Sequence, residues 1–321
     1  MGKFIFKRLL AMIPVLLMVA VLIFTILYFV PGDPAQIMLG STATKYELEQ
    51  MREQLGLTRP FLVQLGDFLY QTFIKFDLGK SYLTGAPVGA EIAARLPRTL
   101  ILGVASMVLA FGIGIPLGIT AAIHQNGWGD RISMIIALLG VSIPTFWLAL
   151  MFVLLFALKL RWFPSSGIGG FKYYVLPTVS LCFGGLATQA RQSRSSMLEV
   201  IRADYVVTAR AKGLSEREVI MKHALPNALN PIITLAGNNL AVIFGGSIVI
   251  ENVFSFPGIG QYMITAINQR DYPIVRGCVV MLAVVFAVIM LLVDIAYAFN
   301  DPRIKARYEN SSRKKVKAKK A

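Results

Sequence analysis

Charged residues are scarce in this chain, and acidic residues are the scarcer kind. Only 15% of the 321 residues are charged, and 17 acidic residues stand against 32 lysines and arginines, so the formal net charge is +15. A soluble domain of this length would carry about 25% charged residues. The mean hydropathy of +0.64 agrees with that deficit. The composition therefore excludes an ordinary soluble domain and requires an apolar surface that faces lipid.

Cysteine and histidine are almost absent as well. Cys182 and Cys278 both fall in apolar segments, so neither a disulfide framework nor a cysteine metal cluster is expected. The two histidines, His124 and His223, are far apart in sequence, which argues against a membrane-embedded enzyme with clustered polar ligands. We expect no catalytic residue, no metal and no bound cofactor in this chain.

A phosphate-binding loop is missing too. Gly79-Lys80-Ser81 resembles the end of such a loop, but the motif needs a glycine five positions earlier, where Ile74 stands. We therefore expect that this chain does not hydrolyse ATP itself.

Long apolar segments are what the chain does contain, and six of them can cross a bilayer as helices. The first follows three basic residues, and its uncharged run exceeds the core of a cleavable signal peptide, so it is expected to remain as a spanning helix. The predicted fold class is an all-α polytopic membrane protein with six transmembrane helices. The segments are residues 9–30, 99–123, 132–158, 173–190, 231–250 and 274–299.

A polar region separates the first two spans. Its amphipathic spacing predicts two short extracytoplasmic helices, 46–55 and 61–76, on either side of a break at 56–60. The chain then divides into an N-terminal transmembrane helix (1–30), an extracytoplasmic region (31–98), a five-helix core (99–300) and a basic tail (301–321). The tail is expected to bind anionic lipid and not nucleic acid.

Lysine and arginine counts predict the orientation. With the amino terminus inside, 20 of the 32 basic residues lie on the cytoplasmic side. Seven of the other 12 belong to the long first loop, where charge has little influence. Both termini are therefore expected in the cytoplasm.

A charged stretch, Asp204 to Pro226, interrupts the apolar core with the sequence DYVVTARAKGLSEREVIMKHALP. Good helix formers precede Gly213, which permits a sharp bend, and Pro226 is expected to stop a second short helix. Ala209 and Ala211 are expected to share one small-residue surface. Composition alone would fit a solvated helical loop equally well.

The spacing in this stretch resembles a known family. Ala209, then Gly213 and finally Leu225-Pro226 follow the cytoplasmic Glu-Ala-Ala motif of membrane subunits in ATP-binding-cassette importers, although Val207, Thr208 and His223 depart from it. The departures look like the peptide and nickel permeases, and so do several other phrases, so the resemblance extends over almost the whole chain. These phrases are PGDP (31–34), GLTRPFLVQLGDF (56–68), DLGKSY (77–82), RSSMLEVIRADYVVTARAKGL (194–214) and VFSFPGIG (253–260).

The resemblance implies a type I importer permease with the MetI-like fold, whose function is binding-protein-dependent import of di- or oligopeptides. It also implies a place in the cytoplasmic membrane of a bacterium or archaeon. The implied partners are a homologous second permease in a heterodimer, two ATPase subunits that hold ATP and Mg²⁺, an extracytoplasmic solute-binding protein and membrane lipid. The residues implied in ATPase coupling are Tyr205, Ala209, Arg210, Ala211, Lys212, Gly213, Leu214 and Pro226.

Candidates for the substrate path or an outer gate come from two places. The family phrase implies a segment near the outer mouth, and polar residues inside apolar segments are possible path linings. The sequence ranks none of them above the others. They are Phe254, Phe256, Pro257 and Gly258 in the first group, and Gln189, Asn238 and Asn239 in the second.

Two alternatives remain at this point. The same importer class carries nickel or a metal-chelate complex with the same motifs. An ion-gradient-driven secondary transporter, a different class, would need buried paired charges or an inverted repeat near the midplane. Asp294 is the one acid within the last apolar run, and it is close to the cytoplasmic end of that run. No repeat is evident in the sequence.

Overall fold

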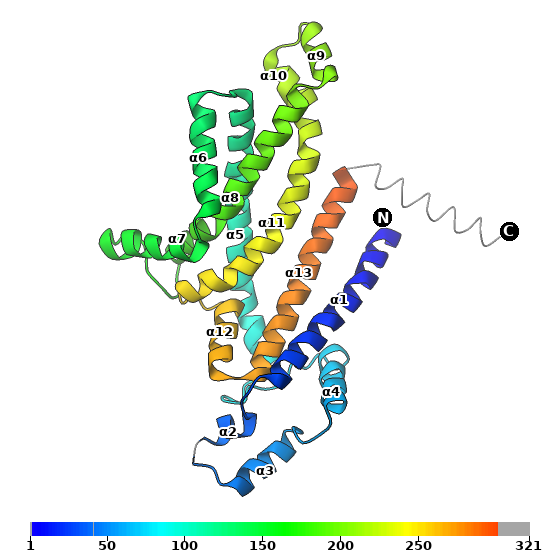
Figure 1. Ribbon diagram of the computed structural model, residues 1–321, viewed down its shortest axis with the longest axis vertical. Coiled ribbons are helices and arrows are strands. Elements are labelled where there is room, and N and C mark those ends of the chain that lie inside the picture. Colours follow the sequence, from blue (N-terminus) through cyan, green and yellow to red (C-terminus); the bar gives the residue numbers. More distant parts are fainter. Residues whose placement is uncertain (1, 41, 301–321) are drawn as a thin grey trace, which may run out of the picture. The chain divides into compact units, whose positions relative to one another are not determined.

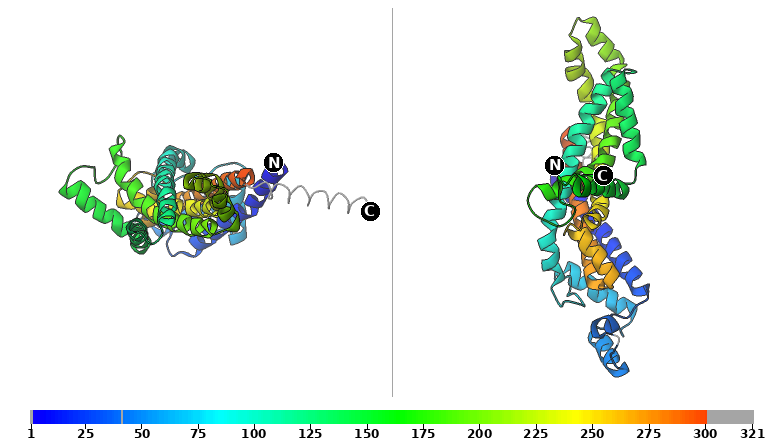
Figure 2. Two further views of the ribbon diagram at one scale, coloured as in Figure 1. Left: turned by 90° about the horizontal axis from the view of Figure 1, so that it is seen from above. Right: turned by 90° about the vertical axis from the view of Figure 1, so that its left-hand side faces the viewer.

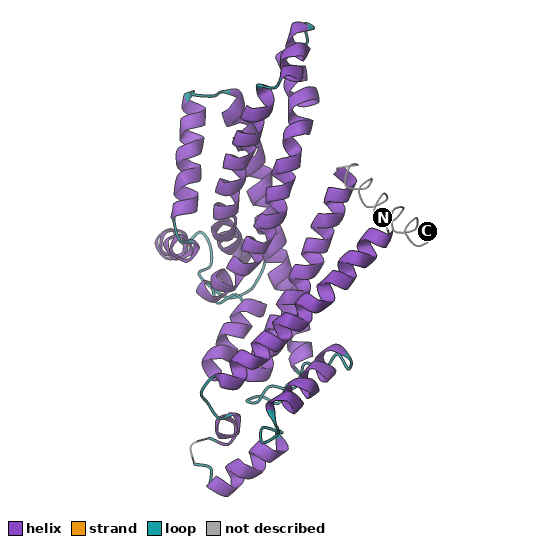
Figure 3. Cartoon of the chain, turned by 45° about the vertical axis from the view of Figure 1, so that its right-hand side comes forward, coloured by secondary structure: helices purple, strands orange, loops and turns teal. Residues whose placement is uncertain are grey.

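The computed structural model describes residues 2–40 and 42–300; for residues 2, 3, 230, 234, 236, 238, 241 and 296–300 the description covers the backbone alone. This part of the chain is helical with no β-strand (Figure 3), and Lys80 and Pro87 form one isolated antiparallel bridge. The basic tail expected at 301–321 lies outside the described residues.

Two compact units make up the described chain. The first unit contains residues 100–256 and 289–300, and the second contains residues 2–99 and 257–288. Contacts therefore group residues 257–288 with the N-terminal part of the chain, which a division in sequence order does not express. The four consecutive regions expected from the sequence stay a prediction, and each unit is described by itself below.

Four helices lie side by side in the first unit (Figure 1). They are the part of α5 (Val88–Ile123) after residue 99, α6 (Trp128–Ser142), α8 (Lys172–Ile201) and α11 (Leu225–Val253). Glycines let α8 approach its neighbours closely: a Cβ on Gly118 of α5 would lie 2.2 Å from the Ala190 carbonyl oxygen, and one on Gly140 of α6 would lie 2.8 Å from the Ala187 Cβ. Small residues at such crossings favour backbone contact between membrane helices.

The third apolar segment is broken. After α6 ends at Ser142, α7 (Thr145–Phe152) begins and continues as the π-helical segment η1 (Val153–Lys159). The axis of α6 and the axis of the helix formed by α7 and η1 differ in direction by 103°. Ile143 has extended backbone angles because the proline ring at Pro144 disfavours a helical residue before it. The span predicted over 132–158 is therefore not one straight helix but two helices joined at Pro144, which together remain one candidate span.

The other apolar segments are helical as predicted. Three helices are long and apolar enough to span a membrane within the described residues, namely Phe4–Phe29, Val88–Ile123 and Tyr272–Ile295, and the bent pair is a fourth candidate. Helix α8 is not among these candidates. The all-α polytopic class is confirmed. Of the six predicted spans, however, not all are helices that are long and apolar enough to cross a membrane by these criteria.

The second unit contains the predicted short helices. They are α3 (Lys45–Gln54) and α4 (Phe61–Phe73), and Gly56 with φ +68° lies in the break between them. Helix α1 (Gly2–Phe29) packs on α4 through Phe24, whose ring centroid lies 5.7 Å from that of Phe61. The N-terminal part of α13 (Tyr272–Asn300) belongs to this unit as well.

Two helices of the second unit were not predicted. Asp33 begins α2 (Pro34–Leu39) by accepting a hydrogen bond from the Ala35 N–H at 3.1 Å, a typical N-cap contact. Helix α12 (Ile259–Gln269) starts after Gly258. Both helices are short, and their apolar residues alone do not distinguish them from loops.

Substitution of Gly118 by alanine should destabilise the first unit, because the new methyl group would overlap the α8 backbone. We expect a loss of about 1–3 kcal/mol in the free energy of unfolding. Gly112, on the same helix, is the matched control, since a Cβ there meets nothing within 4 Å. Thermal unfolding of the detergent-purified variants followed by tryptophan fluorescence checks this, and equal melting temperatures would contradict the close approach.

Candidate functional site

A helical hairpin projects beyond the ends of α8 and α11 in the first unit (Figures 1 and 2). It consists of α9 (Asp204–Ala211), a turn, α10 (Glu216–Glu218) and the π-helical segment η2 (Val219–Ala224), which leads into α11. The helix, bend and helix predicted for this stretch are confirmed. We call residues 204–224 the hairpin.

Gly213 forms the bend of the hairpin. Its φ of +79° is in the left-handed region, where a side chain is costly, and its N–H donates a hydrogen bond to the Arg210 carbonyl at 2.9 Å. A Cβ at this position would meet nothing within 4 Å. The backbone conformation, and not lack of space, therefore requires glycine here.

An ion pair spans the bend. The Arg210 Nε lies 3.0 Å from Glu216 Oε2, and a terminal guanidinium nitrogen lies 2.6 Å from Oε1, so the contact is bidentate. The hydrogen bond from Arg210 holds the pKa of Glu216 below its ordinary value of 4.5, and Glu216 raises the pKa of Arg210. Both side chains are more than a third exposed, so the pair adds a modest, salt-sensitive restraint on the bend.

The inner face of α9 packs on the first unit. Val206 is 0% exposed and Ala209 is 5% exposed, and they share a core cluster with Met197, Val219 and Ile232. Ala211, by contrast, is exposed. The prediction that Ala209 and Ala211 form one presented surface is therefore wrong, because residues two apart on a helix are separated by roughly 200° around its axis.

The outer face of the hairpin combines exposed apolar and basic side chains. Tyr205 is 45% exposed, Val207 is 54% exposed and Leu214 is 37% exposed, and Ala211 and Lys212 are exposed beside them. Exposed apolar side chains on an otherwise polar projection are typical of contact surfaces for other macromolecules.

Pro226 does not end a helix, contrary to the prediction. It lies in the first turn of α11, which continues from η2 without a break in helical structure. Proline has no N–H to donate to the preceding turn, and it lies where the helix changes from π-helical to α-helical hydrogen bonding. The hairpin therefore joins α11 through continuous helix.

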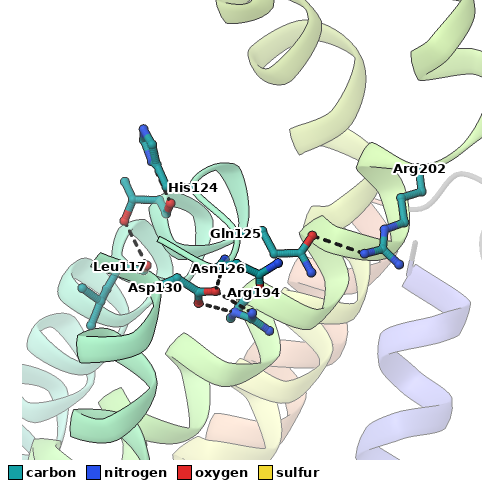
Figure 4. A network of polar contacts seen from close by, with 8 residues as sticks. Leu117, His124, Gln125, Asn126, Asp130, Arg194 and Arg202 are labelled. Carbon is teal, nitrogen blue, oxygen red and sulfur yellow. Dashed lines mark hydrogen bonds and ion pairs between the residues drawn. The ribbon is translucent and has the colours of Figure 1, made fainter. Parts of the chain in front are cut away.

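A polar network ties the base of the hairpin to the loop between α5 and α6 (Figure 4). Arg194 of α8 binds both carboxylate oxygens of the buried Asp130, at 2.5 and 2.7 Å, and the Asn126 N–H donates to the same carboxylate at 2.9 Å. Arg202, at the end of α8, donates to the Gln125 side chain at 3.2 Å. The sequence predicted no role for Asp130; its only signal was an acid at the start of an apolar helix.

The polar path candidates meet inside the first unit. Gln189 is 0% exposed and donates to the Ile232 carbonyl at 3.2 Å, and the Asn239 amide nitrogen lies 3.4 Å from the Gln189 amide oxygen. These contacts link α8 to α11. The side chain of Asn238 lies outside the described residues.

Phe254 and Phe256 are core residues. They are 2% and 0% exposed, and the Phe256 ring meets Tyr174 edge-on with centroids 5.0 Å apart. Both side chains are folded inward, and their place near the outer mouth of the path stays a prediction. In the second unit, Arg98 donates to the Pro257 carbonyl at 3.2 Å and Gly258 precedes α12.

Metal ligands do not gather in the part of the chain that the structure describes. No group of three or more His, Cys, Asp or Glu side chains there could hold an ion.

Two family descriptions match this chain. "Binding-protein-dependent transport system inner membrane component" matches residues 114–306, and the N-terminal description of the same class of membrane component matches residues 1–103. Together they cover all but a few residues before the basic tail, as the resemblance predicted.

Curated relatives and solved structures agree with these matches. A protein named as a peptide transport system permease from Brucella abortus (strain 2308) is 42% identical over 313 residues, which is 95% of this chain and 99% of that relative. A glutathione transport system permease protein from Escherichia coli O6:H1 is 39% identical over 305 residues, with the same coverage. The inward-facing MetNI methionine ABC transporter shares the fold, with a TM-score of 0.54 and 20% identity over 65% of this chain and 96% of that one.

Replacement of Gly213 by valine should strain the bend, at a cost of about 1–2 kcal/mol for a side chain in the left-handed region. Asparagine, which adopts that region more readily, is the matched control and should cost less. Hydrogen exchange of residues 204–224 should be faster in the valine variant than in the asparagine variant. Equal exchange in both would mean that the bend does not depend on the backbone angle of Gly213.

Acid should loosen the same bend. Because the pKa of Glu216 is lowered by its contact with Arg210, the contact contributes fully above about pH 4.5 and is lost as the pH falls through the lowered value. The protection factors of the amides at the bend, measured against the intrinsic exchange rates at each pH, should therefore fall below pH 4.5 in the natural chain. A Glu216→Gln variant should lack that part of the pH dependence, whereas Glu218→Gln should keep it.

Proposed function

Because this chain belongs to the family of binding-protein-dependent transport system inner membrane components, we propose that it is the permease subunit of an ATP-driven importer of di- or oligopeptides. The observation that carries the substrate class is the name of the relatives, which transport peptides or glutathione and match 95% of this chain. Its place in a membrane follows from the family and from its apolar helices.

The proposed assembly has three kinds of protein partner. A homologous second permease completes the pathway, two ATPase subunits bind ATP and Mg²⁺, and a solute-binding protein delivers the peptide on the far side. This chain binds no nucleotide and catalyses no reaction. The excess of basic residues near the hairpin and in the tail supports a cytoplasmic hairpin and cytoplasmic termini.

The hairpin is the proposed contact with an ATPase subunit. Tyr205, Val207, Ala211, Lys212 and Leu214 are exposed and would contact the ATPase, whereas Ala209 would act from behind by fixing α9 to the core. Gly213 holds the bend, and Pro226 lies where η2 passes into α11. When ATP draws the two ATPases together, the hairpin moves with them. It then turns α8, which ends just before the hairpin, and α11, which begins just after it.

The path remains the least constrained part of the proposal. Gln189 and Asn239 are the best-supported candidates, because they form a buried polar contact between the two helices that the hairpin would move. Phe254 and Phe256 would act on the path only through packing. Pro257 and Gly258 would shape the backbone that enters α12.

Nickel or a metal chelate is the second candidate cargo, and no specific observation favours it. An ion-gradient-driven secondary transporter is excluded by the family. Copurification of the chain with the products of neighbouring genes, followed by ATPase assays with candidate peptides and with Ni²⁺, tests the proposal. Stimulation by peptides alone supports it, and an assembly without an ATPase subunit would end it.

Charge reversal separates the two basic residues of the hairpin. Lys212→Glu should weaken attachment of the ATPase about tenfold, because like charges would then meet across an interface. Arg210→Glu should also weaken attachment, but because the ion pair that restrains the bend is lost. Adding Glu216→Arg should therefore restore ATPase attachment in the Arg210→Glu variant and should not restore it in the Lys212→Glu variant. Copurification with the ATPase measures both effects, and unchanged attachment in Lys212→Glu would place the contact elsewhere.

A further inference from the structure

The second unit contains a cavity of about 420 Å³ that the proposed function does not use. One wall is apolar and comes from the end of α1, including Phe24, Leu27 and Tyr28. The polar wall contains Asp33, Arg52, Gln64, Tyr82, Tyr272 and Arg276. Every lining residue belongs to the second unit.

Two polar atoms on this wall are buried without a hydrogen-bond partner among the described residues. They are the Nε of Arg276 and the hydroxyl of Tyr272. The two residues are one turn apart on α13, so they lie on the same face of the helix. A buried donor without a partner costs about 1–3 kcal/mol, so this arrangement needs an acceptor.

Aromatic rings hold the Arg276 guanidinium in place. Its central carbon lies 5.6 Å from the ring centroid of Phe24 and 5.1 Å from that of Phe68. The Tyr82 hydroxyl lines the same cavity beside Arg276. The guanidinium is therefore fixed between α1, α4 and the segment at Tyr82, while its Nε edge remains for another acceptor.

No carboxylate of the cavity is left over for Arg276. Asp33 is paired with Arg52 at 2.7 Å. Asp271, the nearest acid along α13, accepts hydrogen bonds from Ser81 Oγ at 2.5 Å and from the Tyr82 and Leu83 N–H groups at 3.2 and 3.4 Å. The cavity wall thus carries one positive charge beyond the Asp33–Arg52 pair.

Gly32 leaves room for an acceptor beside the Tyr272 hydroxyl. A Cβ at that position would lie only 2.9 Å from the hydroxyl oxygen and 3.1 Å from a guanidinium nitrogen of Arg270. A side chain there would close the space in front of the orphaned hydroxyl. Burial raises the pKa of Tyr82, so this neighbouring hydroxyl also keeps its proton at neutral pH and can donate.

We propose that this cavity binds an oxyanion, a carboxylate or phosphate group, through the Nε edge of Arg276 and the Tyr272 hydroxyl. A guanidinium presents its Nε and one terminal nitrogen side by side, which matches two oxygens of such a group. The apolar wall from α1 accommodates the hydrocarbon part of the same ligand. The group has two sources: the phosphate of an anionic phospholipid, or the free carboxylate of a peptide, the second of which rests on the proposed function.

The test uses the full-length chain, assembled with its partner subunits in phosphatidylcholine nanodiscs. In one arm, phosphatidylglycerol is added to the lipid; in the other, the dipeptide Ala-Ala is compared with its C-terminal amide. A ligand that binds the folded state raises the melting temperature, and at a given ligand concentration the rise is larger for a tighter ligand. We expect stabilisation by phosphatidylglycerol, or by the dipeptide and not by its amide.

Variants then assign the effect to the cavity. Arg276→Gln should weaken the apparent affinity about tenfold, since a charge-assisted bidentate contact is lost. Arg276→Lys should weaken it less, and Tyr272→Phe removes a single donor without altering the packing of the ring. Arg59→Gln is the matched control: Arg59 belongs to the same unit, pairs with Asp67 at 3.1 Å and does not line this cavity.

Stabilisation that disappears in Arg276→Gln, decreases in Tyr272→Phe and persists in Arg59→Gln supports the proposal. The lipid arm remains informative if the peptide cargo is wrong, because it does not depend on transport. Absence of stabilisation in both arms, or an equal loss in Arg59→Gln, would overturn the proposal and leave water as the partner of the two orphaned donors.

Discussion

Close packing around α8 is the constraint on which the first unit depends. Its backbone lies against Gly118 of α5 and its Ala187 side chain lies against Gly140 of α6, at distances that any larger side chain on either glycine would prevent. On another face, Gln189 reaches the backbone of α11. Because packed interiors deform little, α8 moves with its neighbours and not past them. Only two residues separate the end of α8 from the start of α9.

This continuity explains how the hairpin is built. Its inner face is anchored by Val206 and Ala209 in the core, and its base is held by the Asp130–Arg194 pair. Its outer residues, apolar and basic, are left exposed. A projection fixed on one side and open on the other is what the proposed transfer of work from a separate ATPase requires, since a loose loop would absorb the motion instead of transmitting it.

The second unit presents a different physical problem. A guanidinium held between aromatic rings has lost part of its hydration, and cation–π contacts return only part of that free energy. The remaining donors of Arg276 and Tyr272 face a cavity in which the Asp33 carboxylate is already paired with Arg52. An oxyanion would satisfy both donors at once. Such a site would connect the region that follows the first helix to a ligand from the membrane or from the transported material.

The sequence by itself determined the features that depend on local chemistry. Apolar run length and the scarcity of charge require a membrane protein, and the glycine at position 213 permits the left-handed bend that the structure shows. The helices on either side of residues 56–60 follow from amphipathic spacing and a break. The family was recognisable because its motifs are contiguous phrases.

Only the tertiary structure decided which side of each element is buried. The sequence could not separate Ala209 from Ala211, since both are small, and only the core beneath α9 makes one of them an anchor. It could not pair Asp130 with Arg194, which lie 64 residues apart, nor place Arg276 between two rings from other helices. Such contacts are set by how distant segments pack, and no local pattern records that choice.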